Sequence, residues 1–220
     1  MLQLLPGIHR FKTEIHESNE EFFQHLAKGQ NPETMFITCS DSRVVPNLIT
    51  QTDPGELFVL RNAGNIVPAH GSVIGGEEAA IEYAVLALGI KNIVVCGHSQ
   101  CGAVRGILNP EKVENMPGVA KWLEHSAKTR EIVKANYSNM NDECQYNIAI
   151  QENVLVQMEN IKTHPAISRL LWKREVHLFG WVYEMETGEV FIYDQIDETF
   201  QPIAYNDGEF HMVDYRSMPR

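Results

Sequence analysis

Short apolar runs recur along the chain, separated by longer stretches in which apolar and polar residues mix. The runs are too short for typical helices and are bounded by turn residues such as Asp53-Pro54-Gly55, which is typical of buried strands. Strands are therefore predicted at residues 34–39, 56–62, 92–97 and, as a pair reversed at 186–188, within 175–194.

The stretches between these runs have helical periodicity. The first thirty residues read as two helices, the second of them capped by Ser18 or Asn19. A helix is predicted from Gly76 to a stop at Gly89, and further helices at 101–108 and through most of 117–173. Strands that alternate with helices indicate an α/β fold with a mainly parallel central β-sheet flanked by helices.

The chain is long enough for one domain with a substantial core, and no repeat or linker divides it. Residues 1–220 are therefore interpreted as a single domain. Within it we expect an N-terminal helical arm at 1–30, an α/β core at 31–194 and an irregular C-terminal tail at 195–220, which can wrap a neighbouring subunit.

Composition and charge narrow the class of protein. A net charge of −11, without any block of Lys or Arg, argues against nucleic acid or an anionic membrane as partner. We expect no signal peptide and no membrane span, because Pro6 and the charges from Arg10 onward interrupt the N-terminal apolar residues. Four cysteines are too few for a disulfide scaffold, so a cytoplasmic protein is expected.

Two clusters of reactive side chains follow predicted strands. Cys39, Asp41 and Arg43 stand at every second position after the first strand, and His98 and Cys101 follow the third. Either cluster alone has an ordinary explanation: a buried cysteine with a surface ion pair, or a structural His and Cys. Together they supply two thiolates and an imidazole, which suit Zn²⁺ with an open fourth position. Because side chains alternate along a strand, Asp41 is expected on the same side as Cys39.

These motifs resemble those of a known family. The segments CSDSR (39–43) and GHSQCG (97–102), together with GELFVLRNAGNIV (55–67) and AAIEYAV (79–85), are similar to those of β-class carbonic anhydrases. The resemblance implies a Zn²⁺ cofactor held by Cys39, His98 and Cys101, and reversible hydration of CO₂ to bicarbonate and a proton.

The resemblance also implies a catalytic role for Asp41 and Arg43. Asp41 would orient a zinc-bound hydroxide toward CO₂, while Arg43 would keep Asp41 off the metal. In a closed form, favoured at low pH, Asp41 would instead be the fourth zinc ligand. Since two thiolates cancel the zinc charge, we expect activity to rise into mildly alkaline pH.

Further positions match the substrate pocket of the family. Gln30 matches a glutamine that binds substrate in plant-type enzymes. Phe58 and Tyr83 match aromatic residues that the partner subunit contributes to the CO₂ pocket. Ala63 stands where plant-type enzymes have valine, and Gly102 matches a glycine beside the zinc-bound ligand.

One position departs from a family pattern. Members with an inhibitory bicarbonate site hold that anion with a Trp–Arg–Tyr triad. Arg61 and Tyr183 match it, but Phe36 stands at the tryptophan position and has no N–H to donate. This departure puts the inhibitory site in doubt.

The resemblance further implies a homodimer, or a higher assembly of dimers, in which the N-terminal helices pack on the partner subunit. We expect a cytoplasmic setting, with the carboxysome as the alternative. Two other functions stay open at this point: hydrolysis of carbonyl sulfide or carbon disulfide on the same scaffold, and a closed-site protein with a structural zinc. His70, near the presumed site loop, is a weaker candidate for a proton shuttle.

Overall fold

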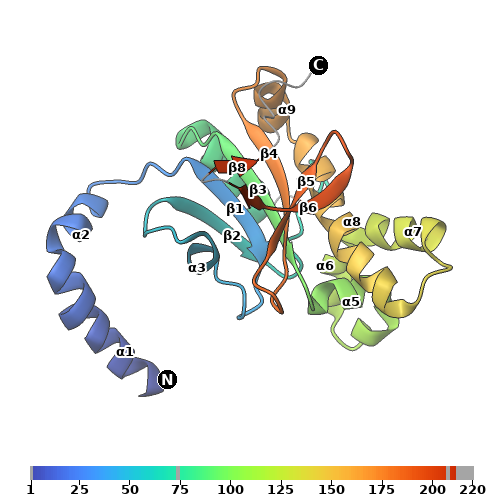
Figure 1. The fold of residues 1–220 in the computed structure, drawn as a ribbon, viewed down its shortest axis with the longest axis horizontal. Coiled ribbons are helices and arrows are strands. Elements are labelled where there is room, and N and C mark those ends of the chain that lie inside the picture. The colour runs from blue at the N-terminus through green and yellow to red at the C-terminus, as the bar shows by residue number, and fades with distance from the viewer. Residues whose placement is uncertain (1, 73–74, 207–208, 212–220) are drawn as a thin grey trace.

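A six-stranded sheet forms the centre of the protein (Figure 1). The structure is a computed structural model and describes residues 2–72, 75–206 and 209–211. The strand order is β2-β1-β3-β4-β5-β6. The strands are β1 (Thr34–Cys39), β2 (Leu57–Asn62), β3 (Asn92–His98), β4 (His177–Tyr183), β5 (Val190–Asp194) and β6 (Thr199–Pro202).

Strands β2, β1, β3 and β4 run parallel to one another, whereas the β4–β5 and β5–β6 pairs are antiparallel. β1 pairs in parallel with β2 and β3, and β3 pairs in parallel with β4. β5 then runs antiparallel to β4, and β6 antiparallel to β5. The predicted α/β class with a mainly parallel sheet is confirmed.

The sheet continues into the segment that was expected to be irregular. β6 pairs with β5, and β7 (Ala204–Asn206) pairs with β8 (Glu209–His211) in a separate two-stranded sheet. Asp194 begins the reversal, because its Oδ1 accepts hydrogen bonds from the backbone N–H groups of Ile196 and Asp197. This local turn chemistry and the apolar Phe200 return the chain to the sheet, so the expectation of an irregular tail was wrong for these residues. Residues 212–220 lie outside the described residues.

Helices connect the strands, and apart from a short unpredicted helix at Pro46–Thr50 they lie where the periodicity predicts them. They include a π-helical segment at Tyr83–Ala87 and short 3₁₀ turns. The helices of the core are α3 (Pro46–Thr50), α4 (Gly76–Glu82), η4 (Tyr83–Ala87), α5 (Gly102–Leu108), η5 (Pro110–Val113), α6 (Pro117–Leu123), η6 (Glu124–Ser126), α7 (Ala127–Asn136), α8 (Asp142–Lys162) and α9 (Pro165–Trp172). Gly89 has φ +66° just after η4, as expected for a helix stop. Among the described residues, none of the helices has the length and apolar character needed to cross a bilayer.

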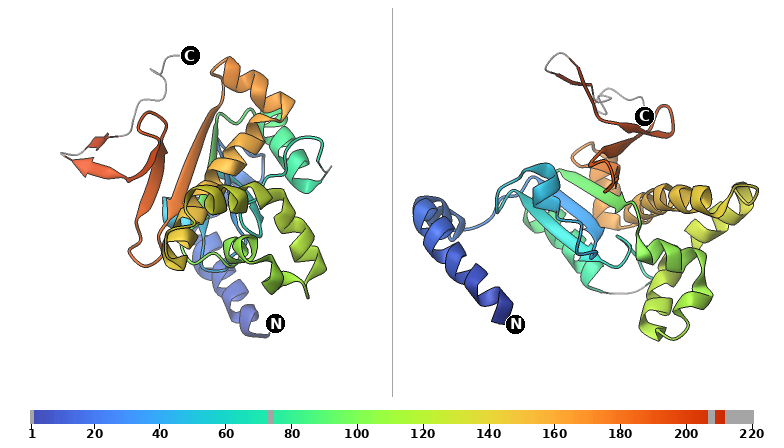
Figure 2. Two further views of the ribbon diagram at one scale, coloured as in Figure 1. Left: turned by 90° about the vertical axis from the view of Figure 1, so that its right-hand side faces the viewer. Right: turned by 60° about the horizontal axis from the view of Figure 1, so that its bottom comes forward.

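The main core lies between the sheet and the helices that follow it. Alternate residues of a strand face opposite sides, so Met35 and Ile37 of β1 join the helix-side core while Phe36 faces away. The helix-side core takes residues from α4 through α9, which lie together on one side of the sheet in Figure 2. Gly97 in β3 allows α8 to pack closely, because a Cβ there would lie 2.9 Å from Val154 Cγ2.

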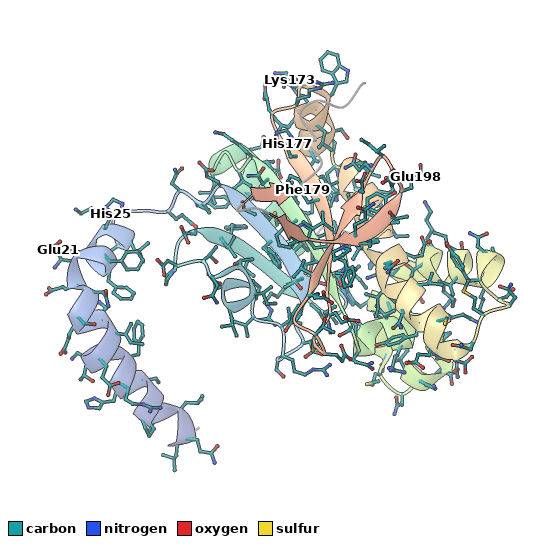
Figure 3. All side chains as sticks on the ribbon, in the orientation of Figure 1. Glu21, His25, Lys173, His177, Phe179 and Glu198 are labelled. Carbon is teal, nitrogen blue, oxygen red and sulfur yellow. The ribbon has the colours of Figure 1, made fainter. Side chains whose placement is uncertain are left out.

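The N-terminal arm projects away from this body (Figure 1). It is almost continuously helical, and none of residues 2–26 is buried; Figure 3 shows Glu21 and His25 on it, remote from the sheet. It comprises η1 (Leu2–Leu4), α1 (Leu5–Arg10), η2 (Phe11–His16), η3 (Glu17–Asn19) and α2 (Glu20–Leu26).

The arm differs in one detail from the sequence expectation. Asn19 does occupy the position before α2, but its side chain makes no capping bond to that helix. Instead Asn19 Nδ2 and Ser18 Oγ donate back to the carbonyl of Ile15. Exposed apolar side chains line the arm, which is compatible with the predicted packing on a partner subunit; these are Leu2, Leu4, Leu5, Ile8, Phe11, Ile15 and Phe22.

Candidate metal centre

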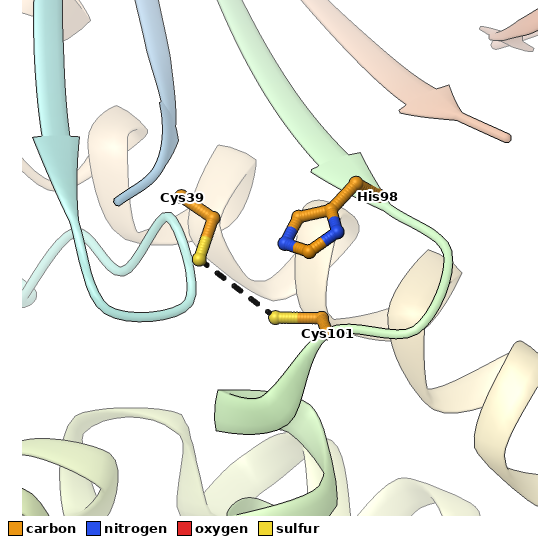
Figure 4. Close-up of side chains that lie close together, drawn as sticks. All are labelled: Cys39, His98 and Cys101. Carbon is orange, nitrogen blue, oxygen red and sulfur yellow. Dashed lines mark hydrogen bonds between the residues drawn. The ribbon is translucent and has the colours of Figure 1, made fainter. Parts of the chain in front are cut away.

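Three ligand-type side chains meet at the carboxyl edge of the sheet (Figure 4). Cys39 is the last residue of β1, His98 is the last residue of β3, and Cys101 immediately precedes α5. Because β1 and β3 are neighbouring parallel strands, their carboxyl ends lie side by side. One ligand atom of each residue lies within 4.8 Å of the other two, and all three side chains are buried.

The imidazole of His98 is oriented for metal binding. Its Nδ1 lies 2.7 Å from the carbonyl oxygen of Ser99, so Nδ1 carries the proton and donates it. Nε2 is then the unprotonated nitrogen, and it is buried without a hydrogen-bond partner among the described residues. A buried acceptor without a partner is costly, whereas a metal ion would satisfy it. The donor set therefore fits Zn²⁺.

The two thiols lie in hydrogen-bond contact with each other. Cys101 Sγ donates to Cys39 Sγ over 3.9 Å. This bond, with a smaller contribution from the Gly64 N–H, lowers the pKa of Cys39 to about 4 against the opposing effect of burial. The same bond and burial raise the pKa of Cys101 well above its usual range. A divalent cation removes the conflict, because both thiolates can then be charged at once.

Asp41 and Arg43 form a two-point ion pair beside this group. Arg43 Nε donates to Asp41 Oδ1 over 3.0 Å and Nη2 donates to Oδ2 over 2.7 Å. These bonds hold the pKa of Asp41 well below its usual range. Asp41 Oδ2 lies 4.0 Å from His98 Nε2, yet among the described residues the metal-ligating group is Cys39, His98 and Cys101 without Asp41.

A turn, rather than strand alternation, places this pair. Asp41 lies on the side of Cys39 and His98, as expected, but β1 ends at Cys39, so strand alternation is not the reason. The backbone N–H of Arg43 donates to Asp41 Oδ1, and the N–H of Val44 donates to the Asp41 carbonyl. This local turn brings Arg43 back over Asp41 and lets Arg43 Nη2 also reach the carbonyl of Gln100, next to Cys101.

Sequence reasoning missed the residues that hold the metal-centre backbone. Arg61 Nε donates to the carbonyl of Cys39 over 3.1 Å, and its Nη2 donates to the carbonyl of Asp41 over 2.7 Å. Tyr146 Oη, from α8, donates to the carbonyl of Cys101 over 2.9 Å. The sequence points to Arg61 only through its match to the family's anion triad. Phe36 of that triad packs edge-on against Trp181, with ring centroids 5.8 Å apart.

A row of buried amides on α8 holds the loop after β2. Asn153 donates to the carbonyl of Gly64, and Gln157 accepts from the N–H of Val67. Gly64 in turn donates its N–H to Cys39 Sγ over 3.4 Å. The signal for this row was available in the sequence, because polar residues recur at helical spacing on a side of α8 that is otherwise apolar.

The predicted pocket residues fall into two groups. Ala63 and Gly102 lie next to the metal centre, since Ala63 precedes Gly64 and Gly102 follows Cys101. Gln30 precedes β1, and Phe58 pairs with Met35 near the amino end of the sheet. Tyr83 packs near Phe58, with ring centroids 6.2 Å apart.

This second group is remote from the metal centre of the same chain. Thr34 and Cys39 stand at opposite ends of β1, which at 3.3 Å per residue are about 17 Å apart. Gln30 lies beyond the amino end, so one chain does not bring Gln30, Phe58 and Tyr83 to its own Cys39. His70 lies in a separate cluster with Glu78 and His164.

Comparisons with known proteins agree with this geometry. The family model for carbonic anhydrase matches residues 34–190. The chain is 49% identical to a carbonic anhydrase of Synechococcus elongatus over 86% of this chain and 70% of that protein. It is 41% identical to a carbonic anhydrase of Pseudomonas aeruginosa over 93% of this chain and 92% of that protein.

Solved structures give the same result. The structure of the β-carbonic anhydrase CcaA superposes with a TM-score of 0.90 and 45% identity, covering 92% of this chain and 98% of that one. Tetrameric β-carbonic anhydrases from Sordaria macrospora give a TM-score of 0.77 at 29% identity, over 86% of this chain and 93% of that one. With its fold, its cysteine–histidine–cysteine group and these relatives in agreement, the chain belongs to the β-carbonic anhydrases.

Proposed function

We propose that this chain catalyses the reversible hydration of CO₂ to bicarbonate and a proton at Cys39, His98 and Cys101, with Zn²⁺ as cofactor. The observation that carries the proposal is the buried, unpartnered Nε2 of His98 facing two cysteine sulfurs, with an arginine-held carboxylate 4.0 Å away. A structural tetrahedral site would need a fourth protein ligand, whereas a three-ligand site leaves room for water.

The cofactor would supply a water-derived nucleophile at neutral pH. Cys39, His98 and Cys101 would hold it, with the proton of Cys101 released on binding because that thiol must ionise to become a ligand. The carbonyl of Ser99 keeps the His98 ring in the tautomer that offers Nε2.

Asp41 would orient the nucleophile. Its Oδ2 can accept a hydrogen bond from the attacking oxygen, so that a lone pair of that oxygen faces the CO₂ carbon. Arg43 keeps Asp41 ionised and turned away from the metal position by its two-point contact. The closed form, with Asp41 as fourth ligand, would require both of these hydrogen bonds to break.

We further propose that the substrate pocket is completed by a second copy of the chain. Gln30, Phe58 and Tyr83 lie at the end of the sheet opposite to their own metal centre. They would face the metal centre of the partner, with Ala63 and Gly102 supplied by the chain that holds the metal. The exposed apolar residues of the arm would provide contact area for this homodimer.

Stopped-flow CO₂ hydration on metal-analysed protein tests the function. We expect one Zn²⁺ per Cys39–His98–Cys101 group and a kcat/KM that rises from pH 6 to 9. The rise would not come from Asp41, because its lowered pKa keeps the carboxylate ionised throughout that range.

The Cys101→Ala variant is the control. It should lose Zn²⁺ from this group, and its activity should fall at least about a hundredfold. Loss of a residue that only hydrogen-bonds a metal ligand already lowers metal affinity or activity about 10–100-fold. Activity that survives the loss of zinc would refute the mechanism. A parallel assay with carbonyl sulfide identifies the substrate, and faster turnover of carbonyl sulfide than of CO₂ would contradict the proposal.

A further inference from the structure

A second group of metal-ligating side chains lies outside the centre described above. It consists of His70 in the loop before α4, Glu78 within α4, and His164 immediately before α9. One ligand atom of each residue lies within 4.8 Å of the other two. His70 and Glu78 are eight residues apart, and the tertiary structure brings the distant His164 to them.

His164 has the hydrogen bonding of a metal ligand. Its side chain is buried, and its Nε2 lies 3.0 Å from the carbonyl oxygen of Pro68. Nε2 must therefore carry the proton and donate it, which leaves the lone pair of the neutral ring on Nδ1. A ligating histidine typically donates its other N–H to a backbone carbonyl in this way.

His70 and Glu78 form the more exposed part of the group. His70 Nδ1 lies 2.7 Å from Glu78 Oε1, and the His70 side chain is 46% exposed. The backbone of the loop is also held in place, because the N–H of His70 donates to Thr163 Oγ1, next to His164. The imidazole rings of His70 and His164 pack edge to face, with centroids 5.7 Å apart.

The three side chains line one small cavity. Its volume is about 150 Å³, which is ample for an ion with bound water. Glu82, one helical turn after Glu78, lines the same cavity and adds a second carboxylate. The remaining lining residues are Ile81, Pro165 and Ala166, so the polar groups of the cavity are all of the ligand type.

We propose that His70, Glu78 and His164 form a second metal site that binds Zn²⁺ or a similar divalent transition-metal ion. Two imidazoles and a carboxylate suit such an ion. Ligand atoms of a tetrahedral Zn²⁺ lie about 3.4 Å apart, given metal–ligand bonds of 2.0–2.1 Å. The His70–Glu78 contact would lengthen slightly on binding, which the half-exposed His70 side chain permits.

An ion bound at this site would hold the loop that follows β2 in place. His70 belongs to the segment after Val67, whose N–H the α8 amide row already holds. An ion shared with Glu78 and His164 would tie this segment to α4 and to the start of α9. The site is independent of the Cys39–His98–Cys101 group, since the two groups share no residue.

Cobalt binding distinguishes the two sites. The full chain is loaded with one equivalent of Zn²⁺ and then titrated with Co²⁺, while its absorption spectrum is recorded. We expect one further equivalent per chain, with visible d–d bands and without the thiolate-to-cobalt band of a cysteine-ligated ion. If the thiolate band grows instead, the Co²⁺ is bound at the Cys39 group and the second site is refuted. This result leaves the proposed CO₂ hydration untouched, because that function is tested by its own assay.

Two variants and a matched control complete the test. Glu78→Gln keeps the side-chain size, and His70→Ala changes an exposed loop residue. Each variant should raise the dissociation constant for the second equivalent of Co²⁺ at least about tenfold. Glu131→Gln, an exposed carboxylate on α7, should bind it as the wild type does. Absence of a second equivalent in the wild type, or unchanged binding in Glu78→Gln, would overturn the proposal.

Discussion

The two ends of the parallel sheet differ in how deeply their candidate functional residues are buried and in how many contacts hold them. At the carboxyl end, Cys39, His98 and Cys101 are buried, and their backbone carbonyls or side chains are held by neighbouring groups. At the amino end, Gln30 is exposed and Tyr83 is 49% exposed. One end holds a buried group of side chains that could bind a metal ion, whereas the other is an exposed surface that carries the candidate pocket residues.

This difference shows what each end requires. A metal centre needs ligands held within a few tenths of an ångström, which only a rigid, buried shell provides. A pocket for a small apolar gas needs mainly aromatic surface, which a neighbouring copy of the chain can supply as it packs. The structure therefore concentrates its buried polar contacts at the carboxyl end.

Asp41→Asn should produce the largest effect at the carboxyl end. The amide has one acceptor oxygen instead of two and carries no charge to pair with Arg43, so it cannot hold Arg43 at two points and also orient the attacking oxygen. We therefore expect kcat/KM to fall on the order of a hundredfold. Zinc content should not change, because Asp41 is outside the ligand group. Stopped-flow assays and metal analysis check this, with the neighbouring Ser42→Ala as control. Retention of wild-type activity would remove Asp41 from the mechanism.

Mixed dimers test whether Phe58, at the amino end of the sheet, contributes to the active site of the partner subunit. Asp41→Asn and Phe58→Ala chains are each expected to be nearly inactive. After subunit exchange, half of the dimers are mixed, and one of their two sites combines an intact metal centre with an intact Phe58. Activity should return to about a quarter of the wild-type value in a two-fold dimer. No recovery despite proven exchange would place Phe58 in the site of its own chain.

Gly64→Ala should loosen the carboxyl end through the backbone. Gly64 has φ +83°, and a Cβ there would lie 2.9 Å from Ala103 Cβ. Backbone strain of this kind costs about 1–3 kcal/mol, and the N–H bond to Cys39 Sγ would shift with it. Urea unfolding and zinc content measure both effects. The control is Gly118→Ala, where no described heavy atom lies within 4 Å of the added Cβ; equal stability of the two variants would refute the strain.

Tyr146→Phe should produce the smallest of these effects. Burial raises the pKa of Tyr146 to about 12, so at working pH the phenol is protonated and donates to the Cys101 carbonyl. Loss of that bond should lower the free energy of unfolding by about 1 kcal/mol. Tyr137→Phe is the comparison. The hydrogen bond from Tyr137 to Glu152 is longer, at 3.3 Å, and less buried, so its loss should lower the free energy of unfolding by less. A larger loss in Tyr137→Phe would contradict this ranking.

Local patterns were enough to predict most elements of the core. The strands at 34–39 and 92–97 and the helix stop at Gly89 follow from short apolar runs and turn residues, which act within a few positions. The tail was misjudged because pairing of β6 with β5 depends on a sheet edge that sequence periodicity does not reveal. Asp41 does lie beside Cys39 and His98, but a turn after β1, and not strand alternation, places it there.

The sequence by itself determined the residue types of the candidate ligands and their order, because two thiols, an imidazole and an ion pair at these spacings form a chemical pattern that needs no coordinates, and its motifs resemble those of the family that the comparisons show. Tertiary structure alone decided which groups hold the ligands: Arg61 on two carbonyls, Tyr146 on a third, and the α8 amides on the loop. It also decided that Phe58 lies about 13 Å from Cys39 along the strand direction, toward the opposite end of the sheet from the candidate metal centre of its own chain. These are contacts between distant segments, and their energies depend on packing that no local pattern encodes.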